Sequence, residues 1–240
     1  MFFSYLNYGY EFHLFSLQHL IATIVFLLIP VTLLLIFKEK IRNFKHESIL
    51  RMSFGVFGLL LEFIQYGWYV FSGRVTDWRL VIATTLCGLA VYLGSIAMIT
   101  LNKKISPVLY YLSYGAVFSF LFADISHGFD RFRFYGFFVL HGLIIFNTVY
   151  LRVIHGFKYD KQAFVRTCKI MLPVLIASII LNHIFDMNFF YMSYPLFEDF
   201  PVYTFLYETN RYLFSLSVFV SYYILMSVMY LLAKIAKWDE

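Results

Sequence analysis

The sequence is poor in charged residues, proline and cysteine. Only 14% of its 240 residues are Asp, Glu, Lys or Arg, and it contains five prolines and two cysteines. No segment is both long enough and rich enough in serine, proline or charge to form a separate soluble domain, and no internal repeat is visible. We therefore expect a single domain over residues 1–240.

Apolar residues make up most of what remains. Hydrophobic residues account for 61% of the chain and aromatic residues for 22%, in runs long enough to cross a bilayer core of about 30 Å. This pattern predicts an all-α fold, a polytopic bundle of seven transmembrane helices embedded in the lipid bilayer, with a kink at Pro30 in the first. The expected spans are residues 15–37, 50–71, 80–101, 105–122, 135–154, 170–190 and 212–233.

The basic residues predict the orientation of the bundle. Most of them fall on one set of connections: Lys38, Lys40, Arg42, Lys45, Arg51, Lys103, Lys104, Arg152, Lys158, Lys161, Arg166, Lys169, Lys234 and Lys237. The opposite connections hold only Arg74, Arg79, Arg131, Arg133 and Arg211. The positive-inside rule then places the amino terminus outside and the carboxyl terminus in the cytoplasm. Topology also explains the net charge of +5, so we expect no nucleic-acid partner.

Two potentially reactive side chains are expected at the same depth in the membrane. His141 stands in the apolar stretch FVLHGLIIFN, residues 138–147, about two turns below the outer surface. Cys87 lies about two turns, or roughly 12 Å, into the span 80–101 at 1.5 Å per residue. Cys168 is expected near the opposite surface, so both thiols should be free. The structural alternative for Cys87 is a small apolar filler.

Further polar side chains gather in the outer half of the membrane. Glu62 and Gln65 share one side of a helix, as do Asn182 and Asp186, because their spacings of three and four residues match a helical turn. The remaining members of this set are His19, Asp124 and Asn188. Because the cytoplasmic half has no comparable set, the sequence predicts a substrate pocket open to the outer leaflet or outer aqueous phase. The alternative for each residue is an interhelical hydrogen bond that holds the bundle together.

A thiol and an imidazole at one depth are the minimum for Cys/His acyl transfer. In that chemistry His141 deprotonates Cys87, and the thiolate attacks an ester. Thr84 or Thr85 is the alternative nucleophile. The amide of Gln65 or Asn182 is a candidate for stabilising the oxyanion, and Glu62 or Asp186 for orienting His141.

Two other functions fit the same residues. One is a zinc-dependent hydrolase that uses His19, His141 and His183 with Asp124 or Asp186. The chain has no HxxxH or HxxxxH spacing, so we expect no metal and no other cofactor. The other is a non-enzymatic binding protein or transporter for a small polar solute.

Three segments, TLCGLAVYLG, HGLIIFNTVYL and NHIFDMNFFYMSYP, resemble the bacterial YwaF-type integral membrane proteins. That family typically has His-Leu-Cys in its third span, His-Gly in the fifth, and Asn followed by Asn-Tyr and Pro after the sixth. This sequence has Thr85 in place of the first histidine and Phe189 in place of the tyrosine. The resemblance implies Cys87 or a neighbouring threonine as nucleophile, His141 as base, Asn182 and Asn188 in the pocket, and a bacterial plasma membrane.

More distantly, the YwaF type is similar to eukaryotic androgen-induced fatty-ester hydrolases and to an ether-phospholipid acyltransferase. The resemblance and the expected equal membrane depth of Cys87 and His141 together favour a membrane-embedded acyltransferase or lipid esterase. Its expected substrate is an outer-leaflet lipid or a lipid-modified protein.

Overall fold

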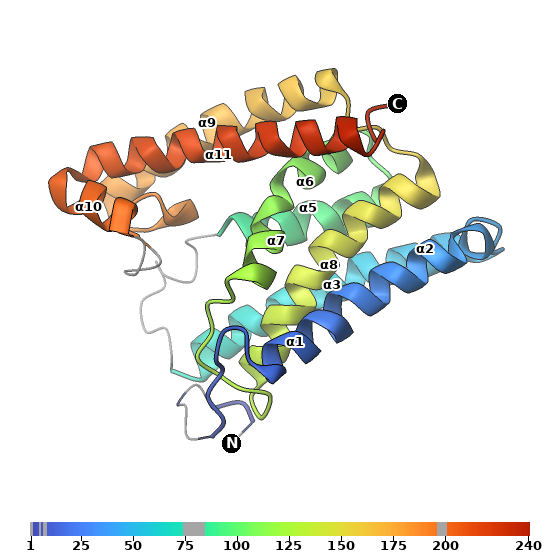
Figure 1. Cartoon of the computed structure of the whole chain (residues 1–240), viewed down its shortest axis with the longest axis horizontal. Coiled ribbons are helices and arrows are strands. Elements are labelled where there is room, and N and C mark those ends of the chain that lie inside the picture. Colours follow the sequence, from blue (N-terminus) through green and yellow to red (C-terminus); the bar gives the residue numbers. More distant parts are fainter. Residues whose placement is uncertain (1, 5, 7–8, 74–84, 196–200) are drawn as a thin grey trace. The chain divides into compact units, whose positions relative to one another are not determined.

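The computed structural model describes residues 2–4, 6, 9–73, 85–195 and 201–240. Within these ranges every regular element is a helix, and strand-like pairing is limited to one isolated bridge between Glu11 and His127. The expected all-α class is therefore confirmed. The chain divides into two compact units (Figure 1): an N-terminal unit of Met1–Thr76 and Cys87–Lys158, and a C-terminal unit of Asp77–Leu86 and Tyr159–Glu240.

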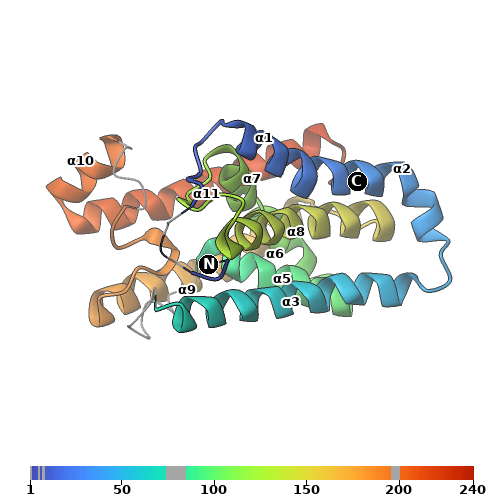
Figure 2. The same cartoon turned by 90° about the horizontal axis from the view of Figure 1, so that it is seen from below.

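Helix α8 (Phe132–His155) is the central element of the N-terminal unit. It packs against α2 (Ile29–Arg42), α3 (Glu47–Phe71), α6 (Ile105–Leu112) and α7 (Tyr114–Leu121), and Figure 2 shows it between α2 and α3. In its most apolar stretch 67% of the residues are buried, against 11% for the helix Leu17–Arg42. The outer helix thus keeps most of its apolar surface exposed, as a lipid-facing helix does.

The helix Leu17–Arg42 contains a π-helical turn before its proline. It consists of α1 (Leu17–Thr23), the π-helical η1 (Ile24–Leu28) and α2. Pro30 has no N–H to donate to the carbonyl of Phe26, four residues earlier, and the wider turn accommodates this loss. The Phe26 carbonyl approaches α8 at Gly142, where an added Cβ would collide with it. The expected disturbance at Pro30 therefore takes the form of a π-turn held against a glycine.

Helices α3 and α5 (Leu86–Thr100) approach each other through small residues. A Cβ on Gly55 would lie 2.7 Å from the backbone oxygen of Ser95, and one on Gly58 would lie 2.6 Å from its hydroxyl. Only part of the expected span 80–101 can be compared, because residues 80–84 lie outside the described residues. The expected span 105–122 is not one helix. It is divided at Ser113 into α6 and α7.

The described part of the C-terminal unit contains two long helices and two short ones. Helix α9 (Lys161–Phe185) packs against α11 (Arg211–Ile235), and α10 (Pro201–Thr209) packs against α11. Asp160 caps α9 by accepting a hydrogen bond from the Ala163 backbone N–H at 2.8 Å, which starts the helix nine residues before the expected span. The short 3₁₀ helix η2 (Phe189–Tyr191) follows α9.

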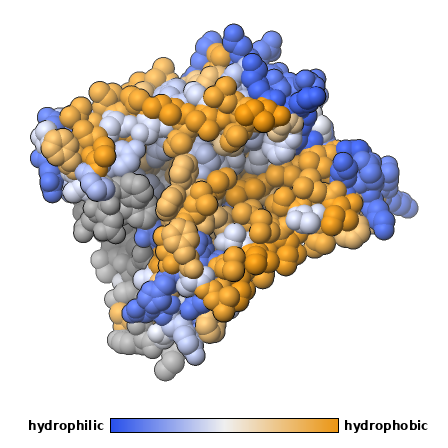
Figure 3. Space-filling model, in the orientation of Figure 1, coloured by the Kyte–Doolittle hydropathy of each residue, from blue (hydrophilic) through white to orange (hydrophobic). Residues whose placement is uncertain are grey.

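Four helices in the described residues are long and apolar enough to cross a membrane: Leu17–Arg42, Phe132–His155, Lys161–Phe185 and Arg211–Ile235. Helix α3 has a similar length, and it carries Arg51, Glu62 and Gln65 on its buried face. Hydrophobic residues cover the sides of the helices in Figure 3, whereas hydrophilic residues gather at the turn between α2 and α3. The chain is thus a helical membrane protein. The count of seven spans and the orientation remain predictions.

Candidate active site

Helix α3 supplies two polar side chains to the interior of the N-terminal unit. Its buried residues follow the spacing of one helical face, and among them Glu62 and Gln65 expose only 6% and 7% of their surface. The amide Nε2 of Gln65 donates a hydrogen bond to the Tyr69 hydroxyl at 3.3 Å. Gly136 on α8 lies against the Gln65 amide, where a Cβ would collide with Oε1. Because position 136 is glycine, α8 leaves enough space for the Gln65 amide to pack against it.

Arg133 stands next to these residues at the start of α8. Its guanidinium lies 5.5 Å from the ring centroids of Tyr69 and Phe137, a cation–π distance. It also interacts electrostatically with Glu62 and with His141. The Nε of Arg133 and the Oε1 of Gln65 are buried without a hydrogen-bond partner among the described residues. Ser95, Ser106 and Asn147 carry such atoms elsewhere in the unit, so an unpartnered atom does not by itself locate a ligand; here an amide and a guanidinium lie together around Tyr69.

His141 is held in one orientation by its own helix. Its Nδ1 lies 2.7 Å from the backbone oxygen of Phe137, and the two rings are 4.3 Å apart between centroids. A carbonyl only accepts hydrogen bonds, so Nδ1 carries the proton and Nε2 keeps its lone pair. No hydrogen-bond partner of Nε2 is found among the described residues. The orienting group of His141 is thus a backbone carbonyl, where the sequence suggested the carboxyl group of Glu62 or Asp186.

Cys87 lies in the first turn of α5 and is half-buried. Its Sγ is 4.0 Å from the hydroxyl oxygen of Ser119 on α7, and the thiol interacts electrostatically with Glu62. Thr85 directly precedes the helix and is also half-buried, whereas Thr84 lies outside the described residues. Cys87 lies near Glu62, and Arg133 lies near both Glu62 and His141, so we group these four side chains from α3, α5 and α8 as one candidate cluster; no hydrogen bond joins Cys87 to His141 among the described residues.

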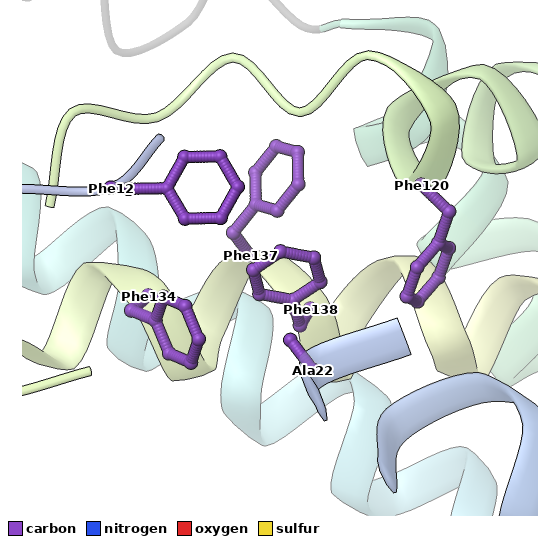
Figure 4. Close-up of a cluster of buried hydrophobic side chains, with 6 residues drawn as sticks. All are labelled: Phe12, Ala22, Phe120, Phe134, Phe137 and Phe138. Carbon is purple, nitrogen blue, oxygen red and sulfur yellow. The ribbon is translucent and has the colours of Figure 1, made fainter. Parts of the chain in front are cut away.

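His19 has a different environment. Its Nε2 donates to the Phe120 carbonyl at 2.7 Å, and its Nδ1 accepts from the Phe15 backbone N–H at 3.1 Å. Both ring nitrogens are thus used by backbone groups, and the bond to Phe120 ties α1 to α7. Figure 4 shows a cluster of buried apolar side chains that includes Phe137 and Phe138. The Phe138 ring lies 6.0 Å from that of His19, and the Phe137 ring lies 4.3 Å from that of His141, both between centroids.

Asn182 and Asn188 bind backbone in the C-terminal unit. Asn182 accepts from the Phe189 N–H at 2.7 Å and donates to the Phe189 carbonyl at 3.1 Å. Asn188 accepts from the Ser193 N–H at 2.8 Å and donates to the Tyr194 carbonyl at 3.1 Å. The two amides together fix the chain that follows α9.

The two predicted carboxylates outside α3 lie at the surface. Asp186 ends α9 in the left-handed conformation, and its carboxylate pairs with Arg211 at 3.3 Å. Asp124 is exposed in the segment between α7 and α8. Of the predicted site residues, Glu62 and Gln65 share the buried face of α3, and Cys87 and His141 lie on α5 and α8; their joint role in one site stays a prediction.

Three neighbours of this cluster were not predicted as site residues: Tyr69, Ser119 and Arg133. The sequence places Arg133 at the outer surface, because Asp124, Asp130 and Arg131 stand near it. Its spacing of four residues from Phe137 and eight from His141 was the available signal, since such residues share one helical face.

The cluster contains a thiol, an imidazole, an amide, a carboxyl group and a guanidinium. A thiol with an imidazole as base, and a hydrogen-bond donor beside the reacting carbonyl, are groups used in acyl transfer. The described residues contain no group of three or more His, Cys, Asp or Glu arranged to hold a metal ion. The imidazole of His19, proposed as a zinc ligand in the hydrolase alternative, has both nitrogens occupied by backbone.

The model of the TMEM164 family, a family of multispanning membrane proteins, matches residues 14–231. No curated protein and no solved structure matches the chain.

Proposed function

The chain belongs to the TMEM164 family, and from this premise we propose that it is a membrane-embedded acyltransferase or lipid esterase. Cys87 is the nucleophile and His141 the base. The observation that carries the proposal is the hydrogen bond from His141 Nδ1 to the Phe137 carbonyl. It leaves Nε2 as a proton acceptor in the cluster that also contains the Cys87 thiol.

The first half of the reaction forms an acyl thioester. His141 Nε2 takes the proton of the Cys87 thiol, and the thiolate attacks the carbonyl carbon of a lipid ester. The tetrahedral intermediate collapses with cleavage of the carbon–oxygen bond, and the leaving alkoxide takes the proton from His141. The acyl group is then attached to Cys87 Sγ.

The second half regenerates the thiol. His141 Nε2 deprotonates the hydroxyl group of an acceptor lipid, or water in an esterase, and the resulting oxygen attacks the thioester carbonyl. The carbon–sulfur bond breaks, and the Cys87 thiolate takes back the proton. In both halves negative charge develops on the carbonyl oxygen, which the Gln65 amide and the Arg133 guanidinium are suited to stabilise.

The resemblance to YwaF-type proteins supports the same assignment of Cys87 and His141. It also supports placing the chain as a multi-pass protein in a bacterial plasma membrane, with the amino terminus outside and the substrate in the outer leaflet. Thr84 and Thr85 stay the alternative nucleophiles, and residues 1–240 are treated as one functional domain.

Cysteine labelling and lipid turnover test the proposal with a control that the chain itself provides. Purified protein is incubated with a fluorescent diacyl phospholipid, and the covalent acyl-enzyme and the released products are measured. Cys87→Ala should abolish both signals, and His141→Ala should remove turnover. Cys168→Ala, which removes the other thiol, should leave both unchanged. Normal turnover by Cys87→Ala would refute cysteine catalysis. If Thr85→Ala then lost turnover, Thr85 would be identified as the nucleophile.

The unpartnered atoms of Gln65 and Arg133 favour a second candidate, binding of a small polar solute. Inorganic phosphate is a suitable probe because the guanidinium group of arginine matches its geometry. Phosphate binding in equilibrium dialysis that Arg133→Gln removes, together with absence of lipid products from the parent protein, would support the second candidate over the first.

A further inference from the structure

An apolar groove runs along the N-terminal unit, away from the candidate active site. It has a volume of about 410 Å³ and lies between the helix Leu17–Arg42, α3 and α8. Phe26, Leu33, Phe37 and Phe146 are among its lining residues, and of the described residues that line it only Tyr150 carries a polar side-chain atom. Its volume is in the range of ligand-binding cavities, about 300–1,000 Å³.

The groove and His141 lie on opposite faces of α8. Val139, Leu143 and Phe146 line the groove, and they share one face because their spacings are close to whole helical turns. His141 follows Val139 by two residues, which is a rotation of about 200° at 3.6 residues per turn. The groove is therefore a site separate from the Cys87 and His141 cluster.

One end of the groove is basic. Phe37 lines this end, and the Lys40 ammonium lies 5.4 Å from its ring centroid. Arg42 reaches from α2 to α8, where its Nη2 donates to the Val153 carbonyl at 2.6 Å, and its Nη1 pairs with the exposed Glu39 carboxylate at 3.0 Å. Lys38 and Lys45 are exposed nearby in the sequence. A ligand that fills the groove would meet these cations where it leaves the apolar lining.

The Tyr150 hydroxyl forms its hydrogen bond outside the groove lining. It donates to the Glu47 carboxylate at 2.8 Å, and the same carboxylate oxygen lies 2.9 Å from His155 Nε2 and 3.5 Å from Arg51 Nε. The one polar atom among the lining residues is thus engaged by α3. The groove offers hydrocarbon contacts along its length, and the charged groups beside it include Lys40 at Phe37 and the Glu47–Arg51 pair at Tyr150.

We propose that the groove binds one acyl chain of an anionic phospholipid, with the phosphate beside Lys40 and Arg42. In a membrane protein the apolar wall selects a hydrocarbon chain, and basic residues at the membrane surface select an anionic headgroup. The glycine at position 142 contributes by allowing α8 to approach η1 closely, which forms the floor of the groove. The bound lipid stabilises the packing of the outer helix Leu17–Arg42 on α8.

Filling the groove tests the chain-binding part. Leu33 lines the groove and Leu35 does not, yet the two side chains are similarly exposed, at 47% and 45%. Protein purified in detergent is analysed by native mass spectrometry for retained phospholipid. Leu33→Trp should retain at least about fivefold less lipid than the parent, because the added rings occupy the groove, whereas Leu35→Trp should retain as much as the parent.

Charge removal tests the headgroup part. The Lys40→Gln, Arg42→Gln double variant is compared with Lys103→Gln, Lys104→Gln, which removes the same charge from another exposed turn of the unit. After exposure to vesicles of equal phosphatidylglycerol and phosphatidylcholine, the first variant should lose about tenfold in preference for phosphatidylglycerol, since each basic residue contributes several-fold. The second should keep the preference of the parent.

Equal lipid retention by Leu33→Trp and Leu35→Trp would overturn the proposal, as would an unchanged headgroup preference in the Lys40, Arg42 variant. If Leu33→Trp fails to fold, Leu143→Phe fills the groove from the side of α8 with a smaller change and is judged by the same criterion. Neither result depends on Cys87 or His141, so this inference and the proposed enzymatic function fail separately.

Discussion

Two amides of the C-terminal unit are fully hydrogen-bonded, whereas two polar side chains of the N-terminal unit are not. In the C-terminal unit, Asn182 uses both ends of its amide on the backbone of Phe189, and Asn188 does the same with the chain up to Tyr194. In the N-terminal unit, Gln65 and Arg133 each keep a buried atom without a partner among the described residues. Satisfied groups stabilise a fold, whereas unsatisfied ones cost free energy and are retained where a ligand uses them. The comparison therefore separates structural amides from candidate functional ones.

The largest effect is expected from replacing the two histidines of the N-terminal unit. His141→Ala should lower lipid turnover by about 10³-fold, the usual contribution of a general base, with little change in thermal stability. His19→Ala should lower the thermal stability and leave turnover per folded molecule nearly unchanged, because two backbone groups lose their partners and each loss costs about 1–3 kcal/mol. Turnover per folded molecule and the thermal unfolding midpoint are measured for both. If both variants changed turnover and unfolding midpoint to the same extent, the distinction between the hydrogen-bonded imidazole of His19 and the available Nε2 of His141 would be wrong.

A smaller effect on turnover is expected at the contact between α3 and α8. Gly136→Ala places a methyl group against Gln65 Oε1 and should lower turnover by about 10²-fold, because small displacements of catalytic groups have effects of this size. Gly67→Ala is the control. A Cβ there comes no closer than 3.9 Å to the Phe71 ring, so activity should be kept and stability should rise slightly. Unchanged turnover in Gly136→Ala would remove Gln65 from the proposed site.

Asn182→Ala should destabilise the C-terminal unit by about 2–3 kcal/mol, since the N–H and the carbonyl of Phe189 both lose their partner. Asn182→Asp keeps an acceptor for the N–H and should cost less. The free energy of unfolding in detergent is the measurement. A loss of turnover without loss of stability would instead place Asn182 in the substrate pocket, as the YwaF resemblance implies.

The smallest effect is expected at the surface of the same unit. Asp186 pairs with Arg211, but 82% of its side chain is exposed, and exposed ion pairs contribute about 0–1 kcal/mol. Asp186→Asn should therefore change stability by less than about 1 kcal/mol, and any change should vanish in high salt. Asparagine also tolerates the left-handed backbone found at this position. A large, salt-independent loss would show that Asp186 has a role beyond this pair.

The sequence predicted long helices well because their signal is the length of an apolar run. The expected spans 50–71, 135–154 and 212–233 fall within helices Glu47–Phe71, Phe132–His155 and Arg211–Ile235. The break at Ser113 was not predicted, since the run of residues 105–122 is apolar enough to read as one helix even though Gly115 follows Ser113 by two residues. Local capping decides such a break: the Ser113 hydroxyl donates to the Tyr110 carbonyl at 2.8 Å.

The candidate site was partly predictable for a related reason. Costly polar residues such as Glu62 and His141 stand out against an apolar background, so periodicity and depth identify them. The roles of Asn182 and Asn188 depend on the path of the chain after α9, which periodicity does not determine. Arg133 was misplaced because composition alone does not distinguish a loop arginine from one in the first turn of a helix.

The π-turn η1 changes the direction in which the two halves of the first long helix present their side chains. A π-turn contains one more residue than an α-turn, and each added residue rotates the following side chains by about 100°. Residues before η1 therefore face a different direction from the one that an unbroken α-helix would give them: His19 reaches α7, while Leu33 and Phe37 border the groove. Deleting one residue from Ile24–Leu28 should restore regular α-helical winding and turn α2 out of register with α8.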